Sequence, residues 1–178
     1  MSTITIKDKS FVPFIEEDKL QDAVKKVADQ INKDYKGKQP IFLGVLNGSF
    51  MFFSDLLKSI DLPCTVSFVK MASYEGTSST GTINELIGLS EDISGKDIIV
   101  VEDIVDTGNT LEKIYQILAD KNANSIKIAT LLYKPEAYKK SHTIDYVGMD
   151  IPNAFVLGYG LDYDGLGRNL SSLFVLKE

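Results

Sequence analysis

The sequence has little cysteine or histidine and no long hydrophobic run. Cys64 is the only cysteine among 178 residues, which excludes an internal disulfide. A single cysteine is typical of a small buried residue in a reducing compartment. His142 is the only histidine and stands in a polar stretch, so we expect it to be exposed and uninvolved. These counts leave no His/Cys cluster of the kind that forms a zinc site.

Positive charge is also scarce. Lys and Arg number 19 against 25 for Asp and Glu, giving a net charge of −6. Because a phosphate backbone requires a basic surface, this balance disfavours a nucleic-acid partner. Residues 1–10 lack the apolar segment of a signal peptide, and no apolar run approaches the roughly 20 residues that span a bilayer. We therefore expect a cytoplasmic protein that does not contact a membrane.

The composition is that of an ordinary globular chain, and apolar patterns alternate along it. With 44% hydrophobic and 25% charged residues, residues 1–178 are expected to form a single domain with one core. Helical spacing of apolar residues is present in residues 19–35, 53–60 and 111–118. Strand-like runs occupy residues 41–46, 65–71, 98–101 and 126–132, with shorter ones at 83–89, 144–148 and 155–159. This alternation predicts an α/β fold, with a mostly parallel sheet flanked by helices.

The most informative stretch follows the strand-like run Ile98–Val101. Glu102 and Asp103 come next, then Asp106, and residues 107–110 (Thr-Gly-Asn-Thr) open a helix. Two carboxylates at a strand's end are costly together unless a cation or ligand hydroxyls use them. A helix start with two hydroxyls suits a phosphate monoester, although the loop alone could be a helix cap without a ligand. Together these features predict a site for a phosphorylated sugar.

Two further loops are expected at the same edge of the sheet. Residues 47–49 (Asn-Gly-Ser) follow the run 41–46, and residues 71–82 follow the run 65–71. Ligands of open α/β sheets bind beyond the carboxyl ends of the strands, so all three loops are candidates for the site. Residues 73–82 are small and polar and bury little apolar surface, so we expect them to be mobile.

Several of these motifs resemble those of a known family. The stretch Val-Val-Glu-Asp-Ile-Val-Asp-Thr-Gly-Asn-Thr-Leu (100–111) resembles the phosphoribosyl-pyrophosphate motif of type I phosphoribosyltransferases, in the form typical of their 6-oxopurine (hypoxanthine-guanine) branch. Residues 45–53 resemble the family's pyrophosphate loop. Ser73-Tyr74 resembles its flexible catalytic loop. Residues 145–148, 151–152 and 155–163 resemble its base-binding hood. The resemblance covers nearly the whole chain and implies a type I phosphoribosyltransferase fold, with a small hood mainly from about 140–178.

The resemblance implies a reaction and its ligands. Phosphoribosyl pyrophosphate and hypoxanthine or guanine would give IMP or GMP and pyrophosphate, with Mg²⁺ as cofactor. Displacing pyrophosphate builds positive charge on the ribose, which clustered carboxylates favour, while Mg²⁺ neutralises the leaving group. A loop that closes would exclude water. The resemblance also implies a homodimer or homotetramer.

Residue roles carry over from the family one position at a time. Asp106 would be the catalytic base at N7 of the purine. The phosphoribosyl group would be bound by Glu102, Asp103, Asp106, Thr107, Gly108, Asn109 and Thr110. Pyrophosphate would be bound by Asn47, Gly48, Ser73, Tyr74 and Arg168. The purine would be bound by Lys134, Phe155, Val156 and Asp162. The Mg²⁺ ligands would be Glu102, Asp103 and Asp162.

Some of these assignments depend on the resemblance alone. The resemblance implies that Lys134 hydrogen-bonds the purine O6 and that Phe155 stacks on the base. Without the resemblance, the residue types alone would predict a solvated surface lysine and a core phenylalanine. Arg168 by itself is also a surface residue. Asn47 departs from the family, which usually has Lys or Arg there, and so removes a positive charge near pyrophosphate. The family often has a cis peptide bond at this point, between residues 46 and 47.

Three alternative functions predict different sequence features. A regulatory protein of the same fold would lack the catalytic carboxylate or the flexible loop, whereas Asp106 and Ser73-Tyr74 are present. A dinucleotide-binding module needs a Gly-x-Gly-x-x-Gly turn, which residues 44–49 do not supply. A different base, such as xanthine or a pyrimidine, is the nearest alternative. Discrimination at C2 would depend on backbone carbonyls near residues 161–162.

Overall fold

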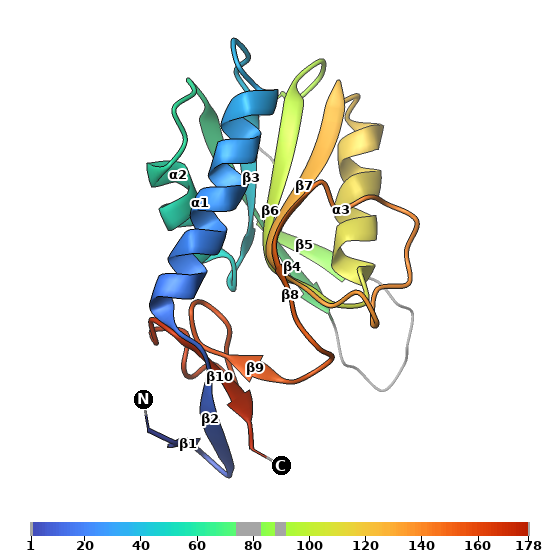
Figure 1. The fold of residues 1–178 in the computed structure, drawn as a ribbon. Coiled ribbons are helices and arrows are strands. Elements are labelled where there is room, and N and C mark those ends of the chain that lie inside the picture. Colours follow the sequence, from blue (N-terminus) through green and yellow to red (C-terminus); the bar gives the residue numbers. More distant parts are fainter. Residues whose placement is uncertain (1, 74–82, 88–91, 178) are drawn as a thin grey trace.

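The large sheet forms the body of the molecule. The computed structural model describes residues 2–73, 83–87 and 92–177, and within them this sheet has the strand order β5-β4-β3-β6-β7-β8 (Figure 1). Its strands are β3 (Ile41–Leu46), β4 (Thr65–Ser73), β5 (Ile83–Ile87), β6 (Asp97–Val105), β7 (Ser125–Tyr133) and β8 (Tyr146–Asp150). All pair in parallel except β5, which lies antiparallel to β4 at the edge. The predicted mostly parallel sheet is confirmed, and the predicted strand at 83–89 is present as β5.

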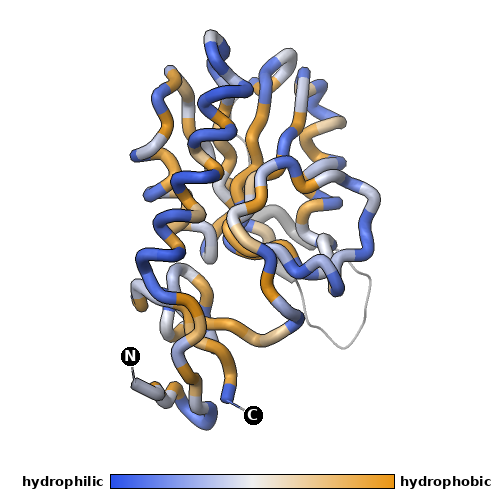
Figure 2. The backbone as a smooth tube through the Cα atoms, viewed as in Figure 1, coloured by the Kyte–Doolittle hydropathy of each residue, from blue (hydrophilic) through white to orange (hydrophobic). Residues whose placement is uncertain are grey.

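Helices cover both faces of this sheet and divide the core in two. They are α1 (Glu17–Asp34), α2 (Phe50–Lys58) and α3 (Asn109–Asp120). Successive side chains of a strand point to opposite faces, so Ile99 and Val101 pack with α1 and α2, whereas Ile98 and Val100 pack with α3. In Figure 2 the strands of the large sheet are mainly hydrophobic and α1 is mainly hydrophilic. Within the described part of the chain, no helix has the length and apolarity to cross a membrane.

A second, smaller sheet is built from both ends of the chain. It is antiparallel, with the order β1-β2-β10-β9, and Figure 1 shows it at the end of the large sheet where α1 begins. Its strands are β1 (Ile4–Ile6), β2 (Lys9–Ile15), β9 (Val156–Leu157) and β10 (Leu173–Leu176). Phe11, Leu157 and Phe174 form its own core. Of these strands, the sequence alone predicts only β9, at residues 155–159, and the observed strand is shorter because the chain turns back at Gly158–Leu161.

Candidate active site

A cavity of about 320 Å³ lies where the two sheets meet. Its walls come from the loop after β3, the end of β6, the end of β7 and the chain on either side of β9. It is lined by Gly48, Asp103, Ile104, Asp106, Lys134, Phe155, Val156, Leu161, Asp162 and Arg168. We call it the site cavity. Eight of its ten residues are ones to which the sequence analysis assigns a binding or catalytic role, although they are spread over more than 120 positions.

A smaller cavity of about 90 Å³ adjoins the site cavity along β6. Glu102 and the helix-opening residues 107–110 line it, and Ile104 and Asp106 line both cavities. The predicted helix start is confirmed: Gly108, with φ +84°, precedes α3 and accepts its first turn's hydrogen bond from the Glu112 N–H at 3.0 Å. The positive end of the helix dipole therefore faces this smaller cavity.

Glu102 and Asp103 are neighbours in β6, and each lines a different cavity. Glu102 lines the smaller cavity and Asp103 lines the site cavity, and their two carboxyl groups also interact with each other. Burial and the charge of Asp103 raise the pKa of Glu102 well above its ordinary value. Burial also raises the pKa of Asp103, to about 6. The pair therefore resists carrying two negative charges unless something positive or hydrogen-bonding lies beside it.

The Asp103 carboxylate lies directly against the loop that follows β3. A β-carbon on Gly48 would lie 1.7 Å from its Oδ2, so only glycine fits there. The other oxygen, Oδ1, accepts a hydrogen bond of 2.9 Å from the Ile104 N–H. The peptide bond between Leu46 and Asn47 is cis, as the resemblance implies. Asp103, a predicted sugar ligand, and residues 47–49, the predicted pyrophosphate loop, are thus in contact.

These carboxylates fit a hard divalent cation. Magnesium is usually held by one or two carboxylates, and substrate oxygens and water complete its octahedron. No group of three or more His, Cys, Asp or Glu side chains able to hold a metal exists among residues 2–73, 83–87 and 92–177. Two buried carboxyl groups with raised pKa values suit an ion that arrives with its ligand, because the positive charge would favour their ionised forms.

Lys134 is buried, contrary to what its residue type alone indicates. It is 7% exposed, and its backbone N–H donates to the carbonyl of Val105 at 3.0 Å, which holds the end of β7 beside the end of β6. Its ammonium group lies 2.7 Å from Oδ2 of Asp106. The Lys134 ammonium, a hydrogen-bond donor, and the Asp106 carboxylate, an acceptor, therefore lie next to each other in the site cavity.

Phe155 forms an aromatic wall of the site cavity. Its side chain is 44% exposed, so it is not the core residue that its sequence context alone indicates. Phe11 of β2 and Tyr163, which follows β9, support it with ring centroids 6.2 and 6.0 Å away. The ammonium of Lys9 lies 5.8 Å from its centroid. An exposed ring held by rings behind it can stack on a planar base.

Arg168 and Asp162 form the third wall of the site cavity. The guanidinium of Arg168 lies 2.5 Å from Oδ1 of Asp162, and its other nitrogen donates to the carbonyl of Gly160 at 2.7 Å. Oδ2 of Asp162 accepts a hydrogen bond of 2.6 Å from the Gly165 N–H. The arginine that sequence alone leaves at the surface is therefore fixed in the cavity.

Some predicted residues lie outside the site cavity, and two lining residues, Ile104 and Leu161, are not among the predicted site residues. Asn47 is exposed beside Gly48, and Ser73 ends β4. Tyr74, with most of the predicted mobile loop, falls outside the described residues. Ile104 lines both cavities and Leu161 lines the site cavity, and neither has a role predicted from the sequence because an apolar side chain offers no catalytic or hydrogen-bonding group. For Ile104, the position between Asp103 and Asp106 was the available signal.

Comparison with known proteins agrees with this geometry. Residues 16–164 match the family model of the phosphoribosyl transferase domain. The hypoxanthine-guanine phosphoribosyltransferase of Streptococcus pneumoniae is 44% identical over 165 residues, 92% of each chain. That of Staphylococcus aureus is 43% identical over 162 residues, 90% of each. A crystal structure of a Staphylococcus aureus hypoxanthine phosphoribosyltransferase has a TM-score of 0.87 and 42% identity, covering 93% of this chain and 91% of that one. This chain therefore belongs to the phosphoribosyltransferase family, in its hypoxanthine-guanine branch.

Proposed function

We propose that this protein transfers the 5-phosphoribosyl group of phosphoribosyl pyrophosphate to hypoxanthine and guanine, giving IMP or GMP and pyrophosphate. In the reaction, N9 of the purine bonds to C1 of the ribose while the bond from C1 to pyrophosphate breaks. The proton on N7 passes to a base as N9 becomes bonded. The relatives named for this activity support the proposal.

The observation that carries the proposal is the contact between Lys134 and Asp106 in the site cavity. On a 6-oxopurine, O6 accepts a hydrogen bond and the adjacent N7–H donates one. An ammonium and a carboxylate 2.7 Å apart present the matching donor and acceptor. Asp106 is then placed to accept the N7 proton as general base. Phe155 would stack on the base, and the backbone of Val156 would meet its edge.

The ribose and its phosphates would occupy the two cavities along β6. The 5′-phosphate would take the smaller cavity, where residues 107–110 offer backbone N–H groups, hydroxyls and a helix N-terminus. Glu102 and Asp103, which line the two adjoining cavities, would hold the ribose hydroxyls. Their negative charge favours the positive charge that develops on the sugar as pyrophosphate leaves. Arg168 and the N–H groups of Asn47 and Gly48 would hold the pyrophosphate.

Magnesium would be held by Glu102 and Asp103, with a second ion at Asp162. When bound, the ions supply positive charge that neutralises the leaving pyrophosphate. The raised pKa values of the first pair support this assignment. The family resemblance further implies a homodimer or homotetramer in the cytoplasm, and size-exclusion chromatography with light scattering tests that state.

A spectrophotometric assay of hypoxanthine, guanine and xanthine, each with phosphoribosyl pyrophosphate and Mg²⁺, tests the proposal. We expect IMP and GMP to form. Nucleotide from xanthine alone would change the base assignment, and no nucleotide from any of the three would overturn the proposed reaction. In that case binding of phosphoribosyl pyrophosphate without turnover would support a regulatory protein of the same fold.

A further inference from the structure

Tyr159 has a backbone conformation that is unusual for a tyrosine. It is the first central residue of a tight turn in which Gly158 and Leu161 exchange backbone hydrogen bonds of 3.1 and 3.0 Å. Its φ is +46°, and that of Gly160 is +100°. Glycine and asparagine are favoured in such turns, because a larger side chain crowds the backbone there. The tyrosine is nevertheless 1% exposed, so its buried side chain must supply the compensating interactions.

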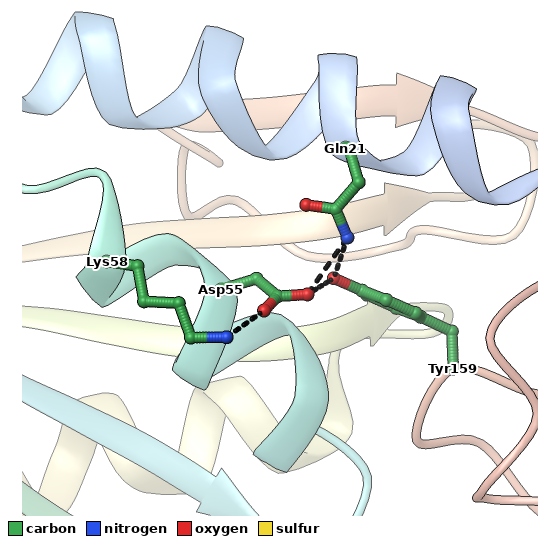
Figure 3. Close-up of polar contacts among 4 residues, drawn as sticks. All are labelled: Gln21, Asp55, Lys58 and Tyr159. Atoms are coloured by element: carbon green, nitrogen blue, oxygen red, sulfur yellow. Dashed lines mark hydrogen bonds and ion pairs between the residues drawn. The ribbon is translucent and has the colours of Figure 1, made fainter.

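The phenol of Tyr159 meets a polar group between α1 and α2 (Figure 3). Its hydroxyl donates a hydrogen bond of 2.5 Å to Oδ2 of Asp55 on α2. The amide of Gln21 on α1 donates to the same carboxylate oxygen at 2.9 Å and to the phenol oxygen at 3.2 Å. Lys58 lies 2.8 Å from Oδ1 of Asp55 and is largely in solvent. Tyr159 is therefore the member of this group that connects the helices to the turn after β9.

The ionised state of the Asp55 carboxylate strengthens the hydrogen bond that it accepts from the Tyr159 hydroxyl. Burial alone would raise the pKa of Asp55, but the hydrogen bonds it accepts from its three neighbours hold that pKa below its ordinary value. Burial and the same carboxylate raise the pKa of Tyr159. At neutral pH the carboxylate is charged and the phenol keeps its proton, so the bond is of the charge-assisted kind.

The turn that Tyr159 anchors lies directly on the pyrophosphate loop. A β-carbon on Gly160 would lie 2.0 Å from the carbonyl oxygen of Gly48, so the two backbones are in contact. The carbonyl of Gly160 accepts the guanidinium hydrogen bond of Arg168 at 2.7 Å, and its N–H donates to the Arg168 carbonyl at 3.0 Å. The position of one turn therefore determines both the packing on Gly48 and the orientation of Arg168.

Asp55 and the pyrophosphate loop belong to the same rigid unit. The loop enters α2 directly: the hydroxyl of Ser49 donates to the Val45 carbonyl at 2.6 Å, and the Ser49 carbonyl accepts from the Phe53 N–H at 2.7 Å. Asp55 follows in the same helix. A bond to Asp55 is therefore a bond to the helix that carries residues 47–49.

We infer that Tyr159 is a positioning residue for pyrophosphate: its bond to Asp55 holds the Gly158–Leu161 turn against Gly48, and so fixes the guanidinium of Arg168 opposite the pyrophosphate loop. The inference rests on the proposed function, since it takes pyrophosphate as the group bound there. Tyr159 itself does not line the site cavity, so it acts through Gly160 and Arg168.

The test replaces Tyr159 by phenylalanine, which removes the phenol oxygen and keeps the buried ring. Titration calorimetry with pyrophosphate and Mg²⁺ should show binding weakened about fivefold, the effect of one lost hydrogen bond. The KM for phosphoribosyl pyrophosphate should rise by the same factor, with the KM for hypoxanthine within twofold of its original value. Asp55→Asn keeps an oxygen that accepts from the phenol, and should retain most of the binding that Asp55→Ala loses.

Tyr146→Phe is the matched control. It removes another buried phenol, whose hydroxyl donates to Asp34 on α1 at 3.0 Å, and neither residue lines the site cavity. We expect a similar loss of thermal stability without weaker pyrophosphate binding. In an Arg168→Ala background, Tyr159→Phe should have no further effect.

Three results would overturn the inference: unchanged pyrophosphate binding in Tyr159→Phe, equal weakening in Tyr146→Phe, or a full effect of Tyr159→Phe without Arg168. A protein that binds pyrophosphate but forms no nucleotide would instead contradict the proposed function alone, because the calorimetry needs no turnover.

Discussion

Lys134 and Asp106 form an ion pair, with 2.7 Å between the ammonium nitrogen and a carboxylate oxygen. The lysine side chain is 8% exposed and the aspartate side chain 45%. A buried ammonium is costly without an ionised partner, so the carboxylate compensates the charge of Lys134. A purine that offers O6 to the lysine and N7–H to the aspartate would take over both contacts. Substitution of Asp106 should therefore lower kcat, whereas substitution of Lys134 should raise the KM for the purine.

Replacing Asp106 by asparagine should abolish most turnover. The amide has nearly the shape of the carboxylate and keeps an oxygen for Lys134, but it cannot accept the N7 proton. General-base catalysis contributes about 10²–10⁴-fold, so we expect kcat with hypoxanthine to fall by that range and the KM for hypoxanthine to change little. Steady-state kinetics at saturating phosphoribosyl pyrophosphate measure both. Turnover that survives Asp106→Asn intact would mean that the base is wrongly assigned.

Replacing Lys134 by methionine should weaken purine binding and leave the sugar site intact. One charged hydrogen bond to O6 is lost, which corresponds to an increase of about 10- to 100-fold in the KM for hypoxanthine and guanine. The KM for phosphoribosyl pyrophosphate should stay within about twofold. Lys127→Met is the control, since Lys127 pairs with Asp145 at 2.7 Å and does not line the site cavity. An equal effect of both substitutions on purine KM would exclude a specific role for Lys134.

Replacing Gly48 by alanine should disrupt the site through Asp103. The added methyl group would lie 1.7 Å from a carboxylate oxygen, so the loop or the carboxylate must move. We expect a loss of about 1–3 kcal/mol in unfolding free energy, typical of overpacking, and binding of phosphoribosyl pyrophosphate too weak to measure. Adding Asp103→Ala should restore stability, because it removes the clashing group, without restoring binding. Urea denaturation and calorimetry test this, and an Asp103→Ala change that gives no rescue would contradict the clash.

Replacing Asn47 by lysine should tighten the binding of phosphoribosyl pyrophosphate. Asn47 is exposed next to the predicted pyrophosphate site, where the family usually has a basic residue. One added charge near the pyrophosphate is worth roughly 1 kcal/mol in water, or about fivefold in KM, and the gain should shrink as salt rises. Asn47→Gln controls for side-chain length and should change nothing. If lysine leaves the KM unchanged at low salt, the side chain at position 47 does not face the pyrophosphate.

The sequence predicts the centre of this fold well because its signals there are local. A buried strand, two carboxylates and a helix start are adjacent in residues 98–111, and the structure has β6, the raised carboxyl pKa values and α3 in that order. The β-branched run fixes the strand, and Gly108 supplies the left-handed cap. No contact with residues far away in the sequence is needed to place the strand, the carboxylates and the helix relative to one another.

The small sheet could not be predicted in the same way. The strands β1 and β10 have three and four residues, too short for a periodic signal. β2 contains Pro13, which argues against a central strand. Its pairing with β1 ends at Phe11, so that side of β2 is open at Pro13 and no ladder hydrogen bond is lost there.

The burial of Lys134 could not be predicted from the sequence either, because it depends on tertiary structure. Its residue type indicates solvent, and only the resemblance indicates a purine contact. The structure buries it because β7 ends beside β6, where Asp106 supplies the opposite charge. A charge partner 28 residues away leaves no local pattern, and neither does the contact of Gly48 with Asp103.

Asp97 lies where β6 begins, at the end of the large sheet opposite the site cavity. Hydrogen bonds from Ser125 at 2.6 Å and Asn124 at 2.7 Å hold the pKa of Asp97 below its ordinary value of 3.8. Because the pKa of Asp97 is lower in the folded than in the unfolded protein, its ionised carboxylate stabilises the fold above pH 3.8. This stabilisation is lost as the pH falls through the lower, folded-state pKa. Asp97→Asn should therefore lower the unfolding free energy by about 1–2 kcal/mol at pH 7.

The same substitution should cost progressively less below about pH 4, because the Asp97 of the original protein then becomes protonated too. Urea denaturation at pH 7, 5 and 3 measures the difference between the two proteins. Asp29→Asn, on an exposed position of α1, removes an equal charge and should leave stability unchanged throughout. A cost of Asp97→Asn that stays constant from pH 7 to pH 3 would show that the hydrogen bonds stabilise the neutral and the ionised carboxyl alike.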